Sequence, residues 1–185
     1  MTFNNLAEIF DAIDEMRTRL YTRLDGLTGE QERFRPAPDG WSIAEIVEHL
    51  AILEERLSKL FSIMITKAEA SGARLSEGSS FRPVSLDEIT ERSLKEKYTA
   101  PEAVRPTGAA TIADSLARLR HSREALHALR PRLETLDLTG ATYPHPAFGP
   151  LDVYQWLALI GLHEGRHLRQ IETLMAAPEF SKNGE

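Results

Sequence analysis

Three histidines have the residue type and the spacing to hold a metal ion. His163 and His167 form a His-Glu-x-x-His motif, and residues four apart lie on one face of a helix. His49 lies in a second segment with helical periodicity. One imidazole from one helix and two from another supply three neutral nitrogen ligands and leave a coordination position open. That pattern is typical of a reactive metal site rather than a structural one.

Two charged residues share the inward stripe of His49. Glu45, one turn earlier, is a candidate to orient the imidazole, and Arg56, two turns later, is a candidate to bind an anionic group near the metal, although for Arg56 the sequence favours the alternative given next. The alternatives are a hydrogen-bonded core histidine and an arginine whose stem reaches past the apolar face to solvent. Three inward histidines in one bundle favour the metal site, since burying unpaired imidazoles together is costly.

Glu164 lies inside the motif but 100° away from the histidine stripe. The catalytic role considered for it is that of general base, as in zinc metallopeptidases, and the alternative is a residue on the helix surface. The peptidase interpretation lacks support, because the extension with a third histidine is absent after His167 and we predict no sheet to bind a peptide. Trp156 and Gln170 share the histidine stripe and are candidate pocket residues, with core packing as the alternative for Trp156.

The composition excludes several other kinds of site. The 185 residues contain no cysteine, which removes disulfides, cysteine-ligated zinc and a thiol nucleophile, and fits a cytoplasmic protein. The formal net charge of -6, without a stripe of Lys and Arg, argues against nucleic-acid binding. No segment approaches the ~20 apolar residues of a membrane helix, so we expect no membrane partner.

Helical periodicity extends over four segments, which cover residues 6–24, 42–70, 111–129 and 151–175. Ser42 with Glu45 has the pattern of a capping box at the start of the second segment. Pro131 is predicted to end or kink the third segment, because proline removes a helical N–H and clashes with the preceding turn.

The connections between these segments differ in length and composition. Glycines and prolines interrupt residues 71–108, where only 85–97 has the pattern of a short helix. A crossover of this length allows the second and third helices to run parallel. Residues 143–150 predict a rigid, extended connection, which His145 orders rather than binding metal. We therefore predict an all-α four-helix bundle, as a single domain over residues 1–178 with a flexible tail at 179–185.

The sequence resembles the DinB/YfiT-like superfamily of four-helix-bundle proteins. The matching residues are Trp41-Ser42, Glu45, His49, His145-Pro146, Phe148-Gly149, His163, His167 and Gln170. The resemblance implies that His49, His163 and His167 bind a divalent metal, commonly zinc or nickel, and that the protein forms a homodimer. Some members are hydrolases or transferases that use low-molecular-weight thiols, and many others have no assigned reaction.

These observations predict a metal-dependent enzyme, either a thiol-dependent S-transferase or a hydrolase, that acts on a small-molecule substrate. Because the chain has no cysteine, any reacting sulfur must come from a low-molecular-weight thiol as cosubstrate. Two other hypotheses remain open. One is a metal-stabilised binding or stress-response module without catalysis, and the other is a bundle with a degenerate site that binds nothing.

Overall fold

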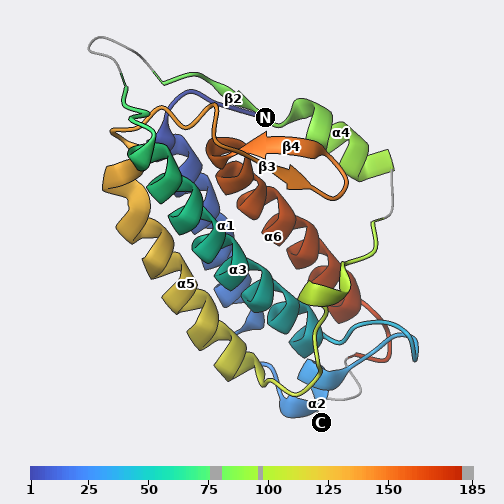
Figure 1. Ribbon diagram of the computed structural model, residues 1–185. Helices are drawn as coiled ribbons and strands as arrows, with labels where there is room; N and C mark the ends of the chain where they lie inside the picture. Colours follow the sequence, from blue (N-terminus) through green and yellow to red (C-terminus); the bar gives the residue numbers. More distant parts are fainter. Residues whose placement is uncertain (76–80, 96–97, 181–185) are drawn as a thin grey trace.

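Four long helices form the body of the computed structural model, which describes residues 1–75, 81–95 and 98–180 (Figure 1). They are α1 (Leu6–Leu24), α3 (Ile43–Ala70), α5 (Ile112–Leu133) and α6 (Val153–Met175). The shorter elements are β1 (Thr2–Phe3), α2 (Gly29–Arg33), β2 (Val84–Ser85), α4 (Asp87–Lys95), the 3-10 helix η1 (Glu102–Val104), β3 (Thr142–His145) and β4 (Gly149–Asp152). The predicted four-helix bundle is confirmed, and two small antiparallel strand pairs, β1–β2 and β3–β4, are added to it.

The two helices that carry the histidines both begin at capping boxes. At the start of α3, the Ser42 hydroxyl accepts the backbone N–H of Glu45, and the Glu45 carboxylate accepts the backbone N–H of Ser42. Asp152 and Gln155 make the same exchange at the start of α6. These reciprocal bonds satisfy N–H groups that a helix start otherwise leaves without a partner. They therefore fix where each helix begins and which residues face inward.

The helices pair in parallel, as the long crossover allows. Along α3 and α5 the contacts advance together, from Glu55 with Arg118 to Glu69 with Arg132. On the other side of the bundle, α1 and α6 also run in the same direction. An added Cβ on Gly161 would lie 3.2 Å from the Ile13 side chain, and one on Gly165 would lie 3.1 Å from that of Met16. Glycine at these two positions lets the backbones of α1 and α6 approach closely.

One helix end and one connection differ from what the sequence predicted. Of the two outcomes expected at Pro131, a helix end or a kink, the end is wrong, because helix α5 continues through Pro131 to Leu133. Because Pro131 lies in the last turn, only one helical hydrogen bond is lost there, and the Arg132–Glu69 ion pair and the buried Leu133 hold that turn in place.

The connection over residues 143–150, predicted to be rigid and extended, folds back on itself as a β-hairpin, and this strand pairing was not predicted. Pro144 pairs with Pro150, which a two-stranded ribbon tolerates because each strand has a free edge. Gly149, with a φ of 80°, supplies the left-handed residue that closes the three-residue loop.

The ends of two other predicted segments also differ in detail. The short helix expected over 85–97 is α4, and its last two predicted residues, 96 and 97, lie outside the described residues. Of the predicted tail 179–185, Phe180 is buried and packs edge-on against Phe34, with ring centroids 5.5 Å apart. The rest of that tail, 181–185, also lies outside the described residues.

A layer of buried charge crosses the bundle between two apolar clusters. Its members are Arg17 from α1, Glu54 from α3, Arg123 from α5 and Glu164 from α6. The Arg17 guanidinium donates to both carboxylates, and so does that of Arg123. The apolar clusters on the two sides of this layer include Ile13, Leu57, Leu126 and Ile160 on one side, and Leu20, Leu50, Leu119 and Leu168 on the other.

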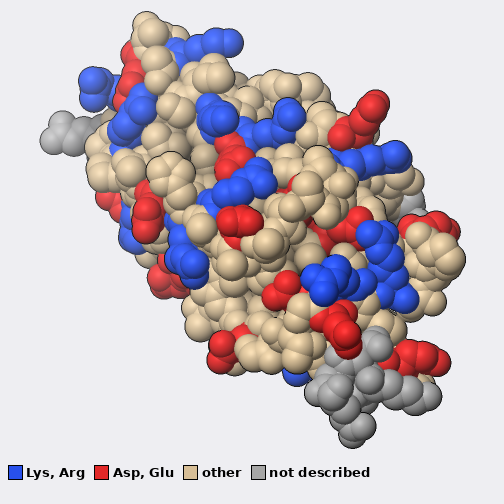
Figure 2. Space-filling model, turned by 90° about the horizontal axis from the view of Figure 1, so that it is seen from below, with Lys and Arg blue, Asp and Glu red and all other residues tan. Residues whose placement is uncertain are grey.

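The surface carries charges of both signs. Figure 2 shows Lys and Arg interspersed with Asp and Glu over one face, without a large area of a single sign. Within the described part of the chain, no helix is both long enough and apolar enough to cross a membrane.

Candidate metal centre

The three histidines predicted from the sequence lie together in the folded chain. His49 comes from α3, and His163 and His167 come from the neighbouring α6. One ring nitrogen from each of the three lies within 4.8 Å of the others. The Nε2 atoms of His49 and His163 are 3.1 Å apart. Among the described residues, the structure thus brings a three-histidine group together from two helices that are distant in sequence.

In two of these rings, those of His49 and His167, a hydrogen bond fixes which nitrogen carries the lone pair. His49 Nδ1 lies 2.6 Å from the Val104 carbonyl oxygen, and His167 Nδ1 lies 3.0 Å from Gln170 Oε1. Both partners are acceptors, so each Nδ1 donates and each neutral ring keeps its lone pair on Nε2. A ligand histidine whose other nitrogen donates to a carbonyl oxygen is the usual arrangement in metal sites.

The environment keeps all three imidazoles neutral, the form that binds metal. Burial lowers the pKa of His49, although the bond to Val104 opposes this shift. Burial, together with the neighbouring His49, lowers the pKa of His167 to about 3. Burial and the two other imidazoles hold the pKa of His163 well below its usual value. A metal ion therefore does not have to displace protons from these rings at neutral pH.

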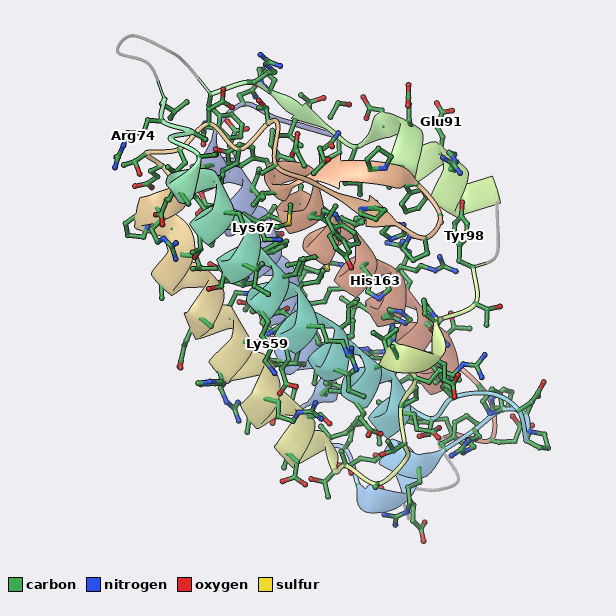
Figure 3. All side chains as sticks on the ribbon, in the orientation of Figure 1. Lys59, Lys67, Arg74, Glu91, Tyr98 and His163 are labelled. Atoms are coloured by element: carbon green, nitrogen blue, oxygen red, sulfur yellow. The ribbon has the colours of Figure 1, made fainter. Side chains whose placement is uncertain are left out.

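The three rings of the cluster differ in their exposure and in their aromatic neighbours. The Trp41 ring lies 5.0 Å from that of His49 and 6.4 Å from that of His167, centroid to centroid. His49 and His167 are buried, whereas His163 is half-buried. Figure 3 shows His163 on α6, between the β3–β4 hairpin and the η1 segment. Of the three rings, that of His163 is thus the most exposed.

His145, at the end of β3, is held in the hairpin rather than in the cluster. Its Nδ1 accepts the backbone N–H groups of Ala147 and Phe148, at 3.0 and 3.3 Å. Its ring stacks on Phe148 and also lies 4.9 Å from that of Trp156. The buried Trp156 in turn donates from Nε1 to the Tyr143 carbonyl, so it anchors the hairpin to α6.

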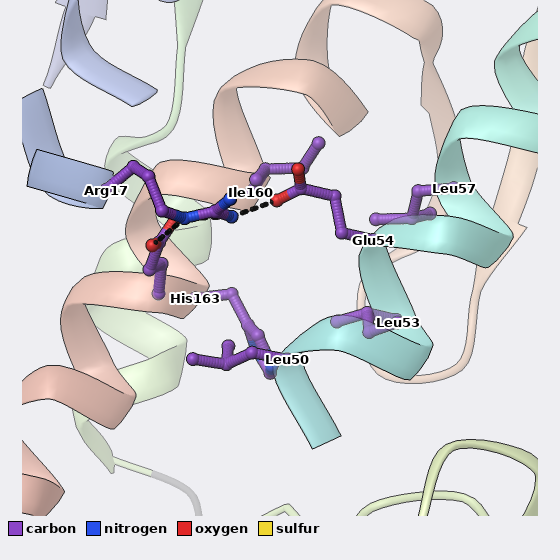
Figure 4. Close-up of a pocket in the computed structure, with 8 residues that line it drawn as sticks. Arg17, Leu50, Leu53, Glu54, Leu57, Ile160 and His163 are labelled. Atoms are coloured by element: carbon purple, nitrogen blue, oxygen red, sulfur yellow. Dashed lines mark hydrogen bonds and ion pairs between the residues drawn. The ribbon is translucent and has the colours of Figure 1, made fainter. Parts of the chain in front are cut away.

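Glu164 does not face the histidines, which corrects the general-base role considered for it. Its Oε1 accepts Arg17 Nε at 2.6 Å, and its Oε2 accepts Arg123 Nη2 at 3.3 Å. Figure 4 shows the Arg17 guanidinium bonded to carboxylates, and Glu54 approaching it from α3. Only a cavity of about 10 Å³ separates this network from His163, which is room for about one water molecule.

Of the other predicted pocket residues, some contact the clustered histidines and others do not. Gln170 bonds His167, as described above. The Glu45 carboxylate does not reach His49, because it accepts the N–H of Ser42 and pairs with Arg35 at 2.7 Å. Arg56 is exposed and does not line the cavity beside His163. The group that orients His49 is instead the backbone carbonyl of Val104.

Sequence reasoning missed the residues that hold Val104 in place. The buried Glu48 carboxylate accepts Thr107 Oγ1 at 2.6 Å and the Gly108 backbone N–H at 2.8 Å. Burial opposes ionisation of Glu48, but these bonds lower its pKa. A carboxylate next to His49 was visible in the sequence, yet nothing there indicated that residues 104–108 return to it. A backbone carbonyl carries no side-chain signal.

The residues present fit a metal ion. Nitrogen ligands at about 2.0–2.1 Å from a tetrahedral zinc ion lie about 3.3 Å from one another, close to the 3.1 Å between His49 Nε2 and His163 Nε2. Two of the three rings have an Nε2 lone pair set by a bond on the opposite nitrogen. Imidazole ligands suit zinc, nickel, copper and iron, so this donor set defines a class of metals and not one ion.

Comparison with known proteins gives consistent matches. The model of the DinB superfamily matches residues 12–171. The uncharacterized protein YuaE of Bacillus subtilis (strain 168) is 30% identical over 162 residues, which cover 87% of this chain and 93% of YuaE.

Two solved structures share the fold at 18% sequence identity. TT2238, a four-helix bundle protein, matches with a TM-score of 0.58 over 91% of this chain and 98% of its own. YfiT from Bacillus subtilis, described as a probable metal-dependent hydrolase with an unusual four-helix bundle topology, matches with a TM-score of 0.56 over 91% of this chain and 85% of its own. The family match extends over most of the sequence and includes all three histidines of the cluster, and on this ground the chain belongs to the DinB superfamily.

Proposed function

We propose that this protein binds one divalent transition metal ion, zinc or nickel, through His49, His163 and His167. We further propose that it uses this ion in hydrolysis or thiol transfer on a small molecule. The observation that carries the proposal is the convergence of three neutral ring nitrogens within 4.8 Å. Three protein ligands leave a position for a small molecule. The description of YfiT as a probable metal-dependent hydrolase supports the same class of reaction.

A bound ion of this kind acts as a Lewis acid and lowers the pKa of a water or thiol ligand. The chain's own residues hold the three nitrogens and keep them neutral. The substrate is placed at His163, the half-buried ring of the three. The absence of cysteine requires that a reacting thiol be a separate small molecule.

The carboxylates nearest to the ligands in the sequence all have other partners. The Glu45 carboxylate contacts Ser42 and Arg35, and that of Glu164 contacts Arg17 and Arg123. The Glu48 carboxylate accepts the Thr107 hydroxyl and the Gly108 backbone N–H. A nucleophile that loses its proton on binding the metal needs no such base. The site therefore suits a thiol at least as well as a water molecule, and we keep both reactions in the proposal.

Elemental analysis by mass spectrometry of protein purified without chelator tests the metal. We expect about one equivalent of zinc or nickel in the wild type and in His121→Ala, which removes an exposed histidine of α5. His49→Ala should lose it. If the wild type holds no metal even after reconstitution, the proposal is wrong and the degenerate-site hypothesis stands.

Turnover is tested separately on the metal-loaded protein. A panel of low-molecular-weight thiols with an alkylating electrophile, and a panel of activated esters, should reveal activity that disappears in His163→Ala. A fully metallated wild type that turns over no member of either panel would instead support the metal-stabilised binding module.

A further inference from the structure

The last part of the crossover lies directly over His49. Val104, the final residue of η1, is buried, and its carbonyl oxygen accepts His49 Nδ1 at 2.6 Å. Because a carbonyl oxygen can only accept, this bond selects the tautomer of His49 in which Nε2 has no hydrogen. The path of the chain at Val104 thus decides which nitrogen His49 presents to His163.

Glu48 fastens this segment to α3 at a second point. Only 3% of Glu48 is exposed, and each of its two oxygens accepts one hydrogen bond from the segment that follows Val104. Thr107 Oγ1 donates at 2.6 Å, and the Gly108 backbone N–H donates at 2.8 Å. Gly108 has a φ of 75°, and an added Cβ would lie 3.3 Å from Glu45 Oε1. The chain can therefore make this turn against α3 only with a glycine at position 108.

The two attachments come from consecutive residues of α3. His49 holds the segment at 104, and Glu48 holds it at 107–108. Only three residues separate Val104 from Gly108, so the carbonyl of Val104 cannot move far while Glu48 keeps its two bonds. The Glu48 contacts are charge-assisted, which makes them stronger than bonds between neutral groups. The contact at 104 thus depends on the contact at 107–108.

We propose that Glu48 and Thr107 are positioning residues of the metal site, acting through the Val104 carbonyl on the tautomer and orientation of His49. This inference rests on the proposed metal function. Groups that orient a ligand histidine typically change metal affinity by about 10–100-fold when they are removed. Thr107 is exposed, so its hydroxyl can be removed at little cost to packing.

The experiment compares Thr107→Val, which removes the hydroxyl and keeps the shape, with Thr107→Ser, which keeps the hydroxyl. Thr139→Val is the matched control, because Thr139 Oγ1 donates a comparable 2.7 Å bond to the Asp137 carboxylate. Zinc and cobalt affinities are measured by competition with a chromophoric chelator, and the cobalt ligand-field spectrum is recorded. We expect Thr107→Val to bind about tenfold more weakly, with a shifted spectrum. Thr107→Ser and Thr139→Val should match the wild type.

Two further measurements separate this inference from its premise. The urea midpoints of the metal-free proteins should be similar for Thr107→Val and Thr139→Val, so that an affinity loss is not a stability loss. Long-range ¹H–¹⁵N correlation spectra of the metal-free proteins report the His49 tautomer directly, and we expect a mixture only in Thr107→Val. If the wild type binds metal and Thr107→Val matches it in affinity and spectrum, the positioning role is wrong. If the wild type binds no metal, the proposed function fails, and an unchanged tautomer would overturn the positioning role independently.

Discussion

Glu164 shows how one helical step changes the role of a residue. It lies between the two histidines of the His-Glu-x-x-His motif, but a rotation of 100° directs its side chain at Arg17 and Arg123. Only 1% of Glu164 is exposed. Burial raises the pKa of Glu164, and the two guanidinium groups oppose this by favouring its charged form. Its carboxylate is the counter-charge of two buried arginines.

Replacing Glu164 with Gln should destabilise the fold and leave the ligand set in place. Removing one partner of a buried pair leaves uncompensated charge, which typically costs about 3–5 kcal/mol. Urea denaturation of the metal-free protein measures this cost, with Glu124→Gln, an exposed position on α5, as control. A variant that keeps wild-type stability but loses turnover would point back to a general base.

The three clustered histidines were predictable because their signal is local. A spacing of four places His163 and His167 on one face, and the apolar stripe around His49 points it inward. The sequence did not indicate that Glu54 of α3 is buried in the charged layer, because the helical stripe drawn through His49 passes through Arg56 and not through Glu54. Helix α3 packs against both α5 and α6, so its buried surface is wider than one stripe. The Val104 and Thr107 contacts depend on how the crossover returns, which local spacing does not encode.

At the scale of elements, the order of the long helices followed from hydrophobic periodicity, and the parallel course of α3 and α5 followed from the length of the crossover. The end of α5 and the β3–β4 hairpin did not follow from the sequence. Pro131 was tolerated because a last helical turn depends little on the bond that proline removes. The β3–β4 hairpin was hidden because Pro144 and Pro150 are unusual in strands. Both errors arise where tertiary contacts outweigh the preference of a single residue type.

The contact between α3 and α5 should contribute a pH-dependent part to the free energy of unfolding, because it includes the carboxylate of Glu55. Glu55 accepts Arg118 Nε and Nη2 at 2.9 and 2.8 Å, and these bonds lower its pKa below the ordinary 4.5. Because the pKa of Glu55 is lower in the folded state, the pair stabilises the fold fully at pH values above the pKa of the unfolded state. This stabilisation is lost as the pH falls through the pKa of the folded state.

We therefore expect Glu55→Gln to cost about 0.5 kcal/mol at pH 7, the size typical of a partly exposed pair. The difference from the wild type should vanish near pH 3. The free energies of unfolding in urea at the two pH values give the result, with Glu124→Gln as control. An equal difference at both pH values would show that the charge of Glu55 does not contribute.

At the scale of the whole molecule, a buried charged layer and a three-histidine cluster are the main polar features inside the bundle. Arg17, Glu54, Arg123 and Glu164 contribute one side chain from each long helix, so any change in the register of one helix breaks ion pairs. The histidine cluster comes from α3 and α6, and His163 lines a small cavity together with Arg17, Glu54 and Glu164. The charged layer and the cluster thus use different residues, but they adjoin at this cavity.

Metal should stabilise the entire fold, since its ligands come from two helices more than 100 residues apart in sequence (His49 and His163 differ by 114). An ion that binds only the folded state adds about 2.7 kcal/mol at a free concentration 100-fold above its Kd. For a chain of this length, about 1 kcal/mol shifts Tm by roughly 2–4 °C, so chelation should lower Tm by roughly 5–10 °C. Differential scanning calorimetry with and without zinc measures this shift, which should be absent in His163→Ala and preserved in His121→Ala. An equal shift in His163→Ala would place the stabilising ion elsewhere on the molecule, because the remaining pair of imidazoles cannot hold it as tightly as three.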